Sequence, residues 1–204
     1  MQIIDLTMPI SNKTPVFFGS PSVSISTLDT FEKDGCNDVL MKFCNHTATH
    51  VDAPFHMIKD GKRLDDFPLE KFIGEAIVFD CCNQKEICLS ENDLNKIRKD
   101  DIVFIYTGSD YKSEEYTKYY PFISNETAQK LMLKQIKIVG TDTLSPDEKP
   151  YEVHKIFLGR NILIVENLIN LSKLVGKRFE CYILPLNIKE ADGAPCRVIA
   201  VIDK

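Results

Sequence analysis

The chain has 204 residues, with 25 Lys and Arg against 30 Asp and Glu, so its formal net charge is −5. Hydrophobic residues make up 44% and charged residues 27%, which are globular values and exclude disorder, collagen and coiled coil. The acidic balance argues against a nucleic-acid partner, because phosphate binding requires a clustered basic surface. A chain of this length, without an internal linker, predicts a single domain over residues 1–204.

Targeting signals and disulfides are not expected. No apolar stretch approaches the roughly 18 residues of a membrane span, and the N-terminus lacks the pattern of a signal peptide. We therefore expect a cytoplasmic protein without a membrane partner. The seven cysteines are an odd number without a Cys-x-x-Cys pair, so we expect small buried hydrophobic residues and assign no chemistry to them.

The order of the predicted elements is typical of a mixed α/β domain. A half-buried strand is predicted over 22–28, because apolar and polar residues alternate there. Ser90 and Ser124 predict N-caps of helices that run to about residues 99 and 134. Strands at both ends with βα alternation between them favour a mixed sheet over a doubly wound one. The other expected strands are 3–10, 39–44, 76–81, 102–106, 136–140, 162–165, 179–184 and 197–202.

The segment 108–121 is long and polar for a connection, and it contains four tyrosines. Such a loop is consistent with a lid over a site or with a surface for a partner. A solvated insertion explains the same composition equally well. The sequence leaves these alternatives open.

Histidine is scarce in this chain, yet three of its four histidines, His46, His50 and His56, lie within eleven residues. In an extended strand His46, His50 and Asp52 project from one face, which is a ligand set for a divalent cation. In a helix Asp52 would lie about 200° around from His50. Pro54 would also end such a helix almost at once. We therefore predict a strand, with His56 beyond the turn at Pro54.

Two His and one Asp leave room for a second ion, and Asp52 could bridge both through its two oxygens. Further ligands must then come from elsewhere in the chain. His154 is the remaining histidine and opens a short helix-like run. Glu166 ends the apolar run 162–165, where a buried carboxylate would need a partner. A surface position for Glu166 is the alternative that composition leaves open.

Residues 46–56, His-Thr-Ala-Thr-His-Val-Asp-Ala-Pro-Phe-His, resemble the H-T-G-T-H-x-D-A-P-x-H motif of a known family. It is the cyclase and bacterial kynurenine formamidase family of metal-dependent hydrolases. Further similar blocks run from end to end, at 4–7, 15–21, 140–147 and 191–197. The resemblance implies a cyclase-like, mixed-sheet α/β domain of the swivelling β/β/α kind. It also implies a homodimer or homotetramer and two divalent metal ions, Zn²⁺ or Mn²⁺.

The resemblance assigns metal ligands to five positions, namely His46, His50, Asp52, His154 and Glu166. Within this set His46 and His50 would hold one ion and His154 the other. The two carboxylates would bridge the ions. His56 would donate and accept protons.

The chain departs from the family pattern at two places. Ala48 replaces the central glycine of the motif, so the backbone there must accept a Cβ atom. Phe17 and Phe18 stand where the formamidase has Trp-Pro, and the Trp is the position linked to substrate contact. We predict substrate contact at these two phenylalanines, with an aromatic wall of different shape.

Other polar residues in the similar blocks carry no firm prediction. Asp192 precedes Gly193, and this pair predicts a turn. For Asp142, Asp147 and Arg197, no physical argument from the sequence separates catalysis from turn formation.

The resemblance implies hydrolysis of a small aromatic amide, such as N-formylkynurenine, by metal-activated water. An imidazole at His56 suits both proton transfers, because its ordinary pKa of about 6.5 lies near neutrality. Two alternatives stay open. One is an isatin-type cyclic amide or lactone hydrolase of the same family, and the other is a non-catalytic metal-binding scaffold.

Overall fold

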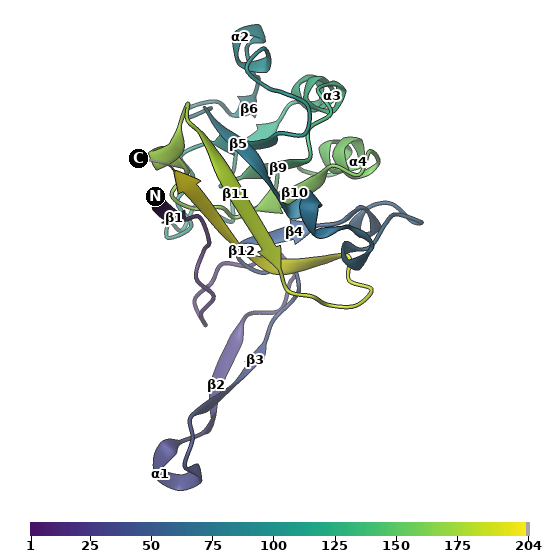
Figure 1. Cartoon of the computed structure of the whole chain (residues 1–204). Coiled ribbons are helices and arrows are strands. Elements are labelled where there is room, and N and C mark those ends of the chain that lie inside the picture. Colours follow the sequence, from purple (N-terminus) through teal and green to yellow (C-terminus); the bar gives the residue numbers. More distant parts are fainter. Residues whose placement is uncertain (203–204) are drawn as a thin grey trace.

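The computed structural model describes residues 1–202, which form a mixed α/β fold as predicted. Its centre is an eight-stranded sheet in the order β1-β12-β11-β5-β7-β9-β10-β4 (Figure 1). Strand β4 pairs with β12 as well as with β10, so the sheet closes on itself like a barrel. The eight strands are β1 (Gln2–Asp5), β4 (His50–Asp52), β5 (Ile73–Asp80), β7 (Ile102–Tyr106), β9 (Ile138–Thr141), β10 (Leu163–Glu166), β11 (Arg178–Pro185) and β12 (Gly193–Ile202).

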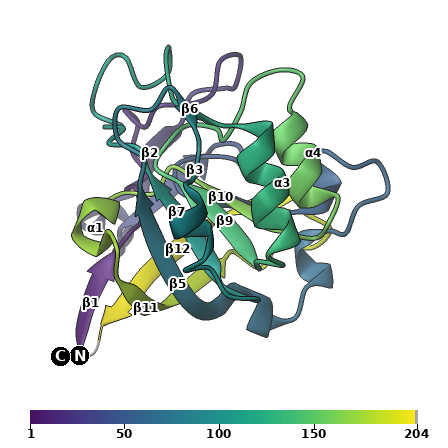
Figure 2. The ribbon, with the colours of Figure 1, turned by 90° about the horizontal axis from the view of Figure 1, so that it is seen from above.

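Parallel strands form the middle of this sheet, from β5 through β7 and β9 to β10. Helices α3 (Asn125–Leu133) and α4 (Glu152–Leu158) lie side by side over one face (Figure 2). Shorter elements are α2 (Glu91–Leu94), the pair β6 (Glu86–Ile87) and β8 (Phe122–Ile123), and the 3₁₀ turns η1 (Pro54–His56), η2 (Leu64–Asp66), η3 (Leu69–Phe72) and η4 (Leu171–Leu174). Within residues 1–202 no helix is both long and apolar enough to cross a bilayer. The cytoplasmic location stays a prediction.

Two hydrophobic cores lie on opposite faces of the parallel strands. On β7, Ile102 and Phe104 pack into the core inside the curved sheet. Val103 and Ile105 pack into the core beneath the helices. A strand buried on both faces has an unbroken apolar run rather than an alternating one. The predicted strand 102–106 therefore coincides with β7.

Both predicted serine N-caps are present, but only one helix has the expected length. The Ser124 hydroxyl accepts a hydrogen bond from the Thr127 N–H, and α3 ends near the expected residue. Ser90 likewise caps α2, yet α2 ends at Leu94 instead of continuing to about residue 99. Beyond Leu94 the Lys96 and Ile97 N–H groups bond only three residues back, to the Asp93 and Leu94 carbonyl oxygens, so the chain continues in turns. The helix that Ser90 caps is therefore shorter than predicted.

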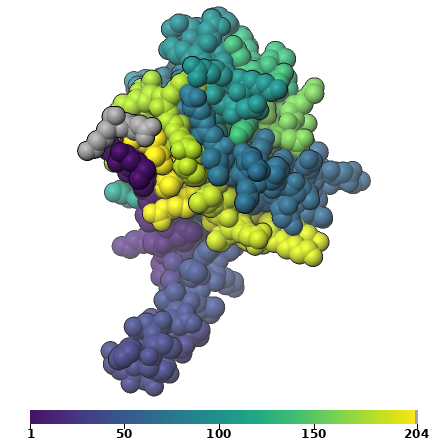
Figure 3. All heavy atoms as spheres, viewed as in Figure 1, coloured from purple at the N-terminus to yellow at the C-terminus, as the bar shows by residue number. Residues whose placement is uncertain are grey.

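A hairpin arm, residues 24–42, extends away from the body of the molecule (Figures 1 and 3). Strands β2 (Ser24–Asp29) and β3 (Asp38–Lys42) pair antiparallel and are joined across α1 (Phe31–Asp34). None of the arm residues is buried. The half-buried strand predicted over 22–28 is confirmed in its burial only at Val23, which precedes β2, because no core formed by residues 1–202 lies beneath the hairpin itself.

Candidate metal centre

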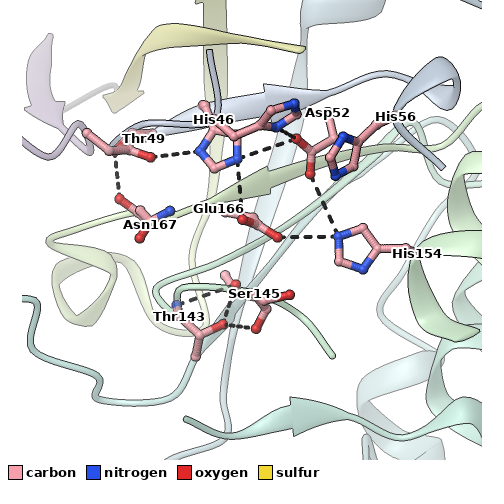
Figure 4. A network of polar contacts seen from close by, with 12 residues as sticks. His46, Thr49, Asp52, His56, Thr143, Ser145, His154, Glu166 and Asn167 are labelled. Carbon is pink, nitrogen blue, oxygen red and sulfur yellow. Dashed lines mark hydrogen bonds and ion pairs between the residues drawn. The ribbon is translucent and has the colours of Figure 1, made fainter. Parts of the chain in front are cut away.

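Antiparallel pairing of β4 with β10 builds the floor of the site. The register places His50 directly opposite Glu166, at the end of β10. His154 comes from α4, and His56 ends the 3₁₀ turn η1 after Pro54. Segments that are distant in the sequence therefore converge on one group of imidazoles and carboxylates (Figure 4).

His46 lies next to this group, but the backbone conformation that places it there differs from the predicted strand. Strand β4 begins only at His50, so the expected strand parity does not include His46. Between them Ala48 has a φ of 54°, in the left-handed region that favours glycine and costs other residues roughly 1 kcal/mol. This turn still brings Nδ1 of His46 within 2.7 Å of Asp52 Oδ1. The predicted neighbourhood is present, although its backbone is a kink rather than a strand.

Each of the two buried carboxylates presents one oxygen to each of two imidazoles. Asp52 Oδ1 lies 3.4 Å from Nε2 of His50, and Asp52 Oδ2 lies 3.9 Å from Nε2 of His154. For Glu166 the corresponding distances are 3.3 Å from Oε2 to His50 and 3.5 Å from Oε1 to His154 (Figure 4). Ligands about 2.1 Å from a tetrahedral zinc ion lie about 3.4 Å apart. The donor atoms are therefore spaced to share cations, and they fit a divalent metal.

Hydrogen bonds on the far side of each imidazole hold these donors in place. Nδ1 of His50 lies 2.8 Å from the Ala48 carbonyl oxygen, to which it can donate. Nδ1 of His154 contacts Asp147 Oδ1 at 2.5 Å, and Asp147 also accepts from the backbone N–H of Val153. Such partners fix the tautomer and leave Nε2 for a metal. Asp147 therefore positions a candidate ligand, a role that the sequence did not indicate.

The site has an excess of buried negative charge. Burial alone would lower the pKa of His154, but hydrogen bonds and the charges of Asp147 and Glu166 raise it to about 10. Burial likewise opposes the charged form of His50, yet the Asp52 carboxylate raises its pKa well above the ordinary value. Protonated imidazoles thus neutralise the buried carboxylates when no metal is bound. A divalent cation could replace these protons.

A cavity of about 300 Å³ opens onto the imidazoles and carboxylates. Phe17 lines it, whereas Phe18 is 94% exposed and is not among the lining residues. Only Phe17 of the predicted pair is therefore placed to contact a substrate in this cavity. Other apolar lining residues include Met57, Leu144 and Tyr151.

The tyrosine-rich segment 108–121 is anchored behind the site. Tyr116 is buried, and its hydroxyl lies 2.7 Å from Asn167 Oδ1, next to Glu166. Tyr119 in the same segment is exposed. The segment is therefore fixed to the wall of the site at Tyr116, which a purely solvated insertion would not be.

Asp192, like Asp147, is a residue of the site that the sequence reasoning missed. Its Oδ2 lies 2.9 Å from Nε2 of His46 and 3.0 Å from Nδ1 of His56. A turn was predicted here, and the only signal for more was its place in a block similar to the family. Arg197 instead pairs with Asp5 on an exposed part of the sheet.

Comparisons with known proteins agree with this geometry. Residues 4–148 match the family described as "Putative cyclase". A kynurenine formamidase from Bacillus cereus is 29% identical over 200 residues, which cover 96% of this chain and 95% of that relative. A solved structure described as a predicted metal-dependent hydrolase from Bacillus stearothermophilus is 26% identical, with a TM-score of 0.81 over 98% of this chain and 97% of that one.

The same fold occurs in isatin hydrolase A from Labrenzia aggregata, with a TM-score of 0.89 and 24% identity, over 100% of this chain and 94% of that one. At that identity the likeness concerns the fold. The family match covers well over half of this chain. The chain therefore belongs to the cyclase family, as the motif at 46–56 predicted.

Close backbone packing beside His46 gives a first testable prediction. A Cβ atom at Gly193 would lie 2.7 Å from Cε1 of His46 and 2.7 Å from the Val51 carbonyl oxygen, so the Gly193→Ala variant must displace one of them. We expect its dissociation constant for Zn²⁺ to rise by about 10-fold or more, as measured by competition with a chromophoric chelator. Gly74→Ala is the control, because the nearest atom to its Cβ would be Nζ of the flexible Lys137 side chain, at 3.4 Å. Unchanged affinity in Gly193→Ala would contradict the geometry.

Proposed function

We propose that this cyclase-family protein is a metal-dependent hydrolase that cleaves the C–N bond of a small aromatic amide. The observation that carries the proposal is the pair of buried carboxylates, Asp52 and Glu166, each facing the same two imidazoles. A further imidazole, His56, lies beside them at the cavity. Because relatives of similar length are named kynurenine formamidase, N-formylkynurenine is the first substrate to test.

We propose two divalent ions, Zn²⁺ or Mn²⁺, for this site. With one oxygen of each carboxylate toward His50 and the other toward His154, the donors divide into two sets that share Asp52 and Glu166. His46 would complete the set around His50, because its ring lies next to Asp52. Imidazole and carboxylate ligands without thiolate suit both metals.

Metal content tests the two-ion proposal directly. Protein purified without chelator should carry two ions per chain, and His154→Ala should carry one, because the second set then loses its only imidazole. Asp52→Ala should lose both ions. Elemental analysis by mass spectrometry measures the content, with Lys155→Ala, an exposed residue of the same helix, as the control. Two ions retained in His154→Ala would refute the assignment.

The residues of the site would supply proton transfer and substrate binding, and the ions would supply Lewis acidity. Divalent ions in such a site supply Lewis acidity, which polarises a carbonyl oxygen and lowers the pKa of water to about 7. His56 is partly exposed at the cavity, with Nδ1 held by Asp192, so its Nε2 is left to take a proton and pass it to the leaving nitrogen. The apolar wall that includes Phe17 and Tyr151 would hold an aromatic ring.

Replacing His56 separates proton transfer from metal binding. We expect His56→Ala to lower kcat for N-formylkynurenine by ~10²–10⁴, with the metal content unchanged. The rate is followed by the absorbance of the kynurenine product. A fully active variant would exclude His56 as the proton-transfer group.

A panel of substrates decides between the remaining functions. Isatin and lactones belong in it, because the cavity also suits a flat cyclic amide and the fold occurs in isatin hydrolase. Turnover of isatin without turnover of N-formylkynurenine would favour the cyclic substrate. Bound metal without turnover of any member would favour a non-catalytic scaffold.

We also propose that the chain forms a homodimer or homotetramer through its hairpin arm. A two-stranded hairpin with no core beneath it is marginally stable in water. The arm exposes large apolar side chains that a second copy could cover in a closed symmetric assembly. These side chains are Leu28, Phe31, Val39, Leu40 and Met41.

A charge placed on the arm should break this assembly. We expect the unmodified protein to sediment as a dimer or tetramer and Leu40→Asp to shift toward the monomer. Leu133→Asp, at an exposed leucine on α3, is the control and should sediment like the unmodified protein. An unmodified protein that is monomeric at micromolar concentration would contradict the proposal.

A further inference from the structure

We infer that Asp192 is a positioning residue that sets the tautomers of both His46 and His56 through one carboxylate oxygen. The inference rests on the proposed function, in which His46 is a metal ligand and His56 transfers protons. It goes beyond that function because it joins metal binding and proton transfer to one side chain that is neither a ligand nor a proton-transfer group.

All three contacts of the Asp192 carboxylate come from the region of the motif at 46–56. Oδ2 lies 3.0 Å from Nδ1 of His56 and 2.9 Å from Nε2 of His46. Oδ1 accepts a hydrogen bond of 2.6 Å from Nδ2 of Asn45, so both oxygens are held. The Ala53 N–H donates to the Asp192 carbonyl at 2.9 Å, which fixes the main chain beside η1.

These contacts decide which ring nitrogen of each histidine carries a hydrogen and which can offer its lone pair. An ionised carboxylate can only accept hydrogen bonds, so the nitrogen that faces it must carry the hydrogen. In neutral His56 the lone pair is then on Nε2. His46 faces a carboxylate with each ring nitrogen, Asp192 with Nε2 and Asp52 with Nδ1, so both nitrogens carry hydrogen until a cation replaces the one on Nδ1, which lies 2.7 Å from Asp52 Oδ1. Asp192 thus turns one histidine into an Nδ1 ligand and the other into an Nε2 base.

An amide at position 192 cannot make the same three contacts. Asn has the shape of Asp but replaces one oxygen by an NH₂ group. If the NH₂ group faces the imidazoles, it meets the ring N–H groups, and no acceptor is left for either donor. If it faces Asn45, it meets the Nδ2 group that now donates to Asp192 and to the Gly193 carbonyl oxygen. Asp192→Asn is therefore a near-isosteric variant that disturbs hydrogen bonding and leaves packing almost unchanged.

Two measurements on the full chain test the inference. We expect Asp192→Asn to raise the dissociation constant for Zn²⁺ by about 10–100-fold, since partners of this kind hold the orientation of metal ligands. At saturating metal its kcat should fall by ~10² or more with little change in KM, because His56 loses its preferred tautomer. Asp65→Asn is the control. Asp65 accepts a hydrogen bond from the Glu190 N–H on the same loop but contacts no imidazole, so both constants should stay near those of the unmodified protein.

A double-mutant cycle with His56→Ala separates the two effects. If Asp192 acts on kcat through His56, then Asp192→Asn should lower kcat no further in the His56→Ala background. It should still weaken Zn²⁺ binding there, through His46. Additive losses in kcat would overturn the His56 part, and an unchanged Zn²⁺ affinity would overturn the His46 part.

The outcomes also distinguish this inference from the proposed function. If the unmodified protein hydrolyses no amide, the proposed function fails, but the Zn²⁺ affinity of Asp192→Asn still tests the link to His46. Circular dichroism checks that the variant folds. Asp192→Glu keeps the carboxylate, and recovery of Zn²⁺ affinity in it relative to Asp192→Asn would support the role of the charged acceptor. Equal loss in both variants would count against it.

Discussion

The structure depends on two carboxylates, Asp52 and Glu166, that are almost entirely withdrawn from solvent. Asp52 and Glu166 lie on neighbouring antiparallel strands, and each points one oxygen at His50 and one at His154. Burying such a pair is costly unless cations or protons compensate it. The hydrogen bonds behind the imidazoles, the register of β4 with β10 and the raised pKa of His154 follow from this one requirement.

Closure of the sheet makes this arrangement rigid. Strand β4 is only three residues long, yet it is paired on both sides, by β10 and by β12. Gly193 on β12 lies so close to His46 that no side chain fits between them. A short strand held on both edges places its side chains more exactly than a loop could. The hairpin arm shows the opposite case, since within residues 1–202 its two strands pair only with each other.

Local patterns in the sequence were enough for elements whose environment is local. The unbroken apolar run 102–106 predicted β7, and the strand parity that grouped His50 with Asp52 agrees with β4, where the two lie beside each other. Their role as metal ligands stays a prediction. Three features depend on distant parts of the fold and were missed. The left-handed turn at Ala48 replaced a strand, the arm had no core beneath it, and Asp192 reached the site from far along the chain. The pattern of neighbouring residues in the sequence carries no information about such long-range contacts.

Pairing of β4 with the final strand also has a consequence for how the protein matures. Residues 46–56 leave the ribosome long before β12, so during translation the candidate ligands exist without one wall of their site. Both walls of the candidate metal centre are therefore present only after β12 has been synthesised. Without a metal, protons on His50 and His154 balance the charges of Asp52 and Glu166. Because the pKa values of these imidazoles are raised in the folded protein, the metal-free protein loses stability as alkaline conditions remove the protons.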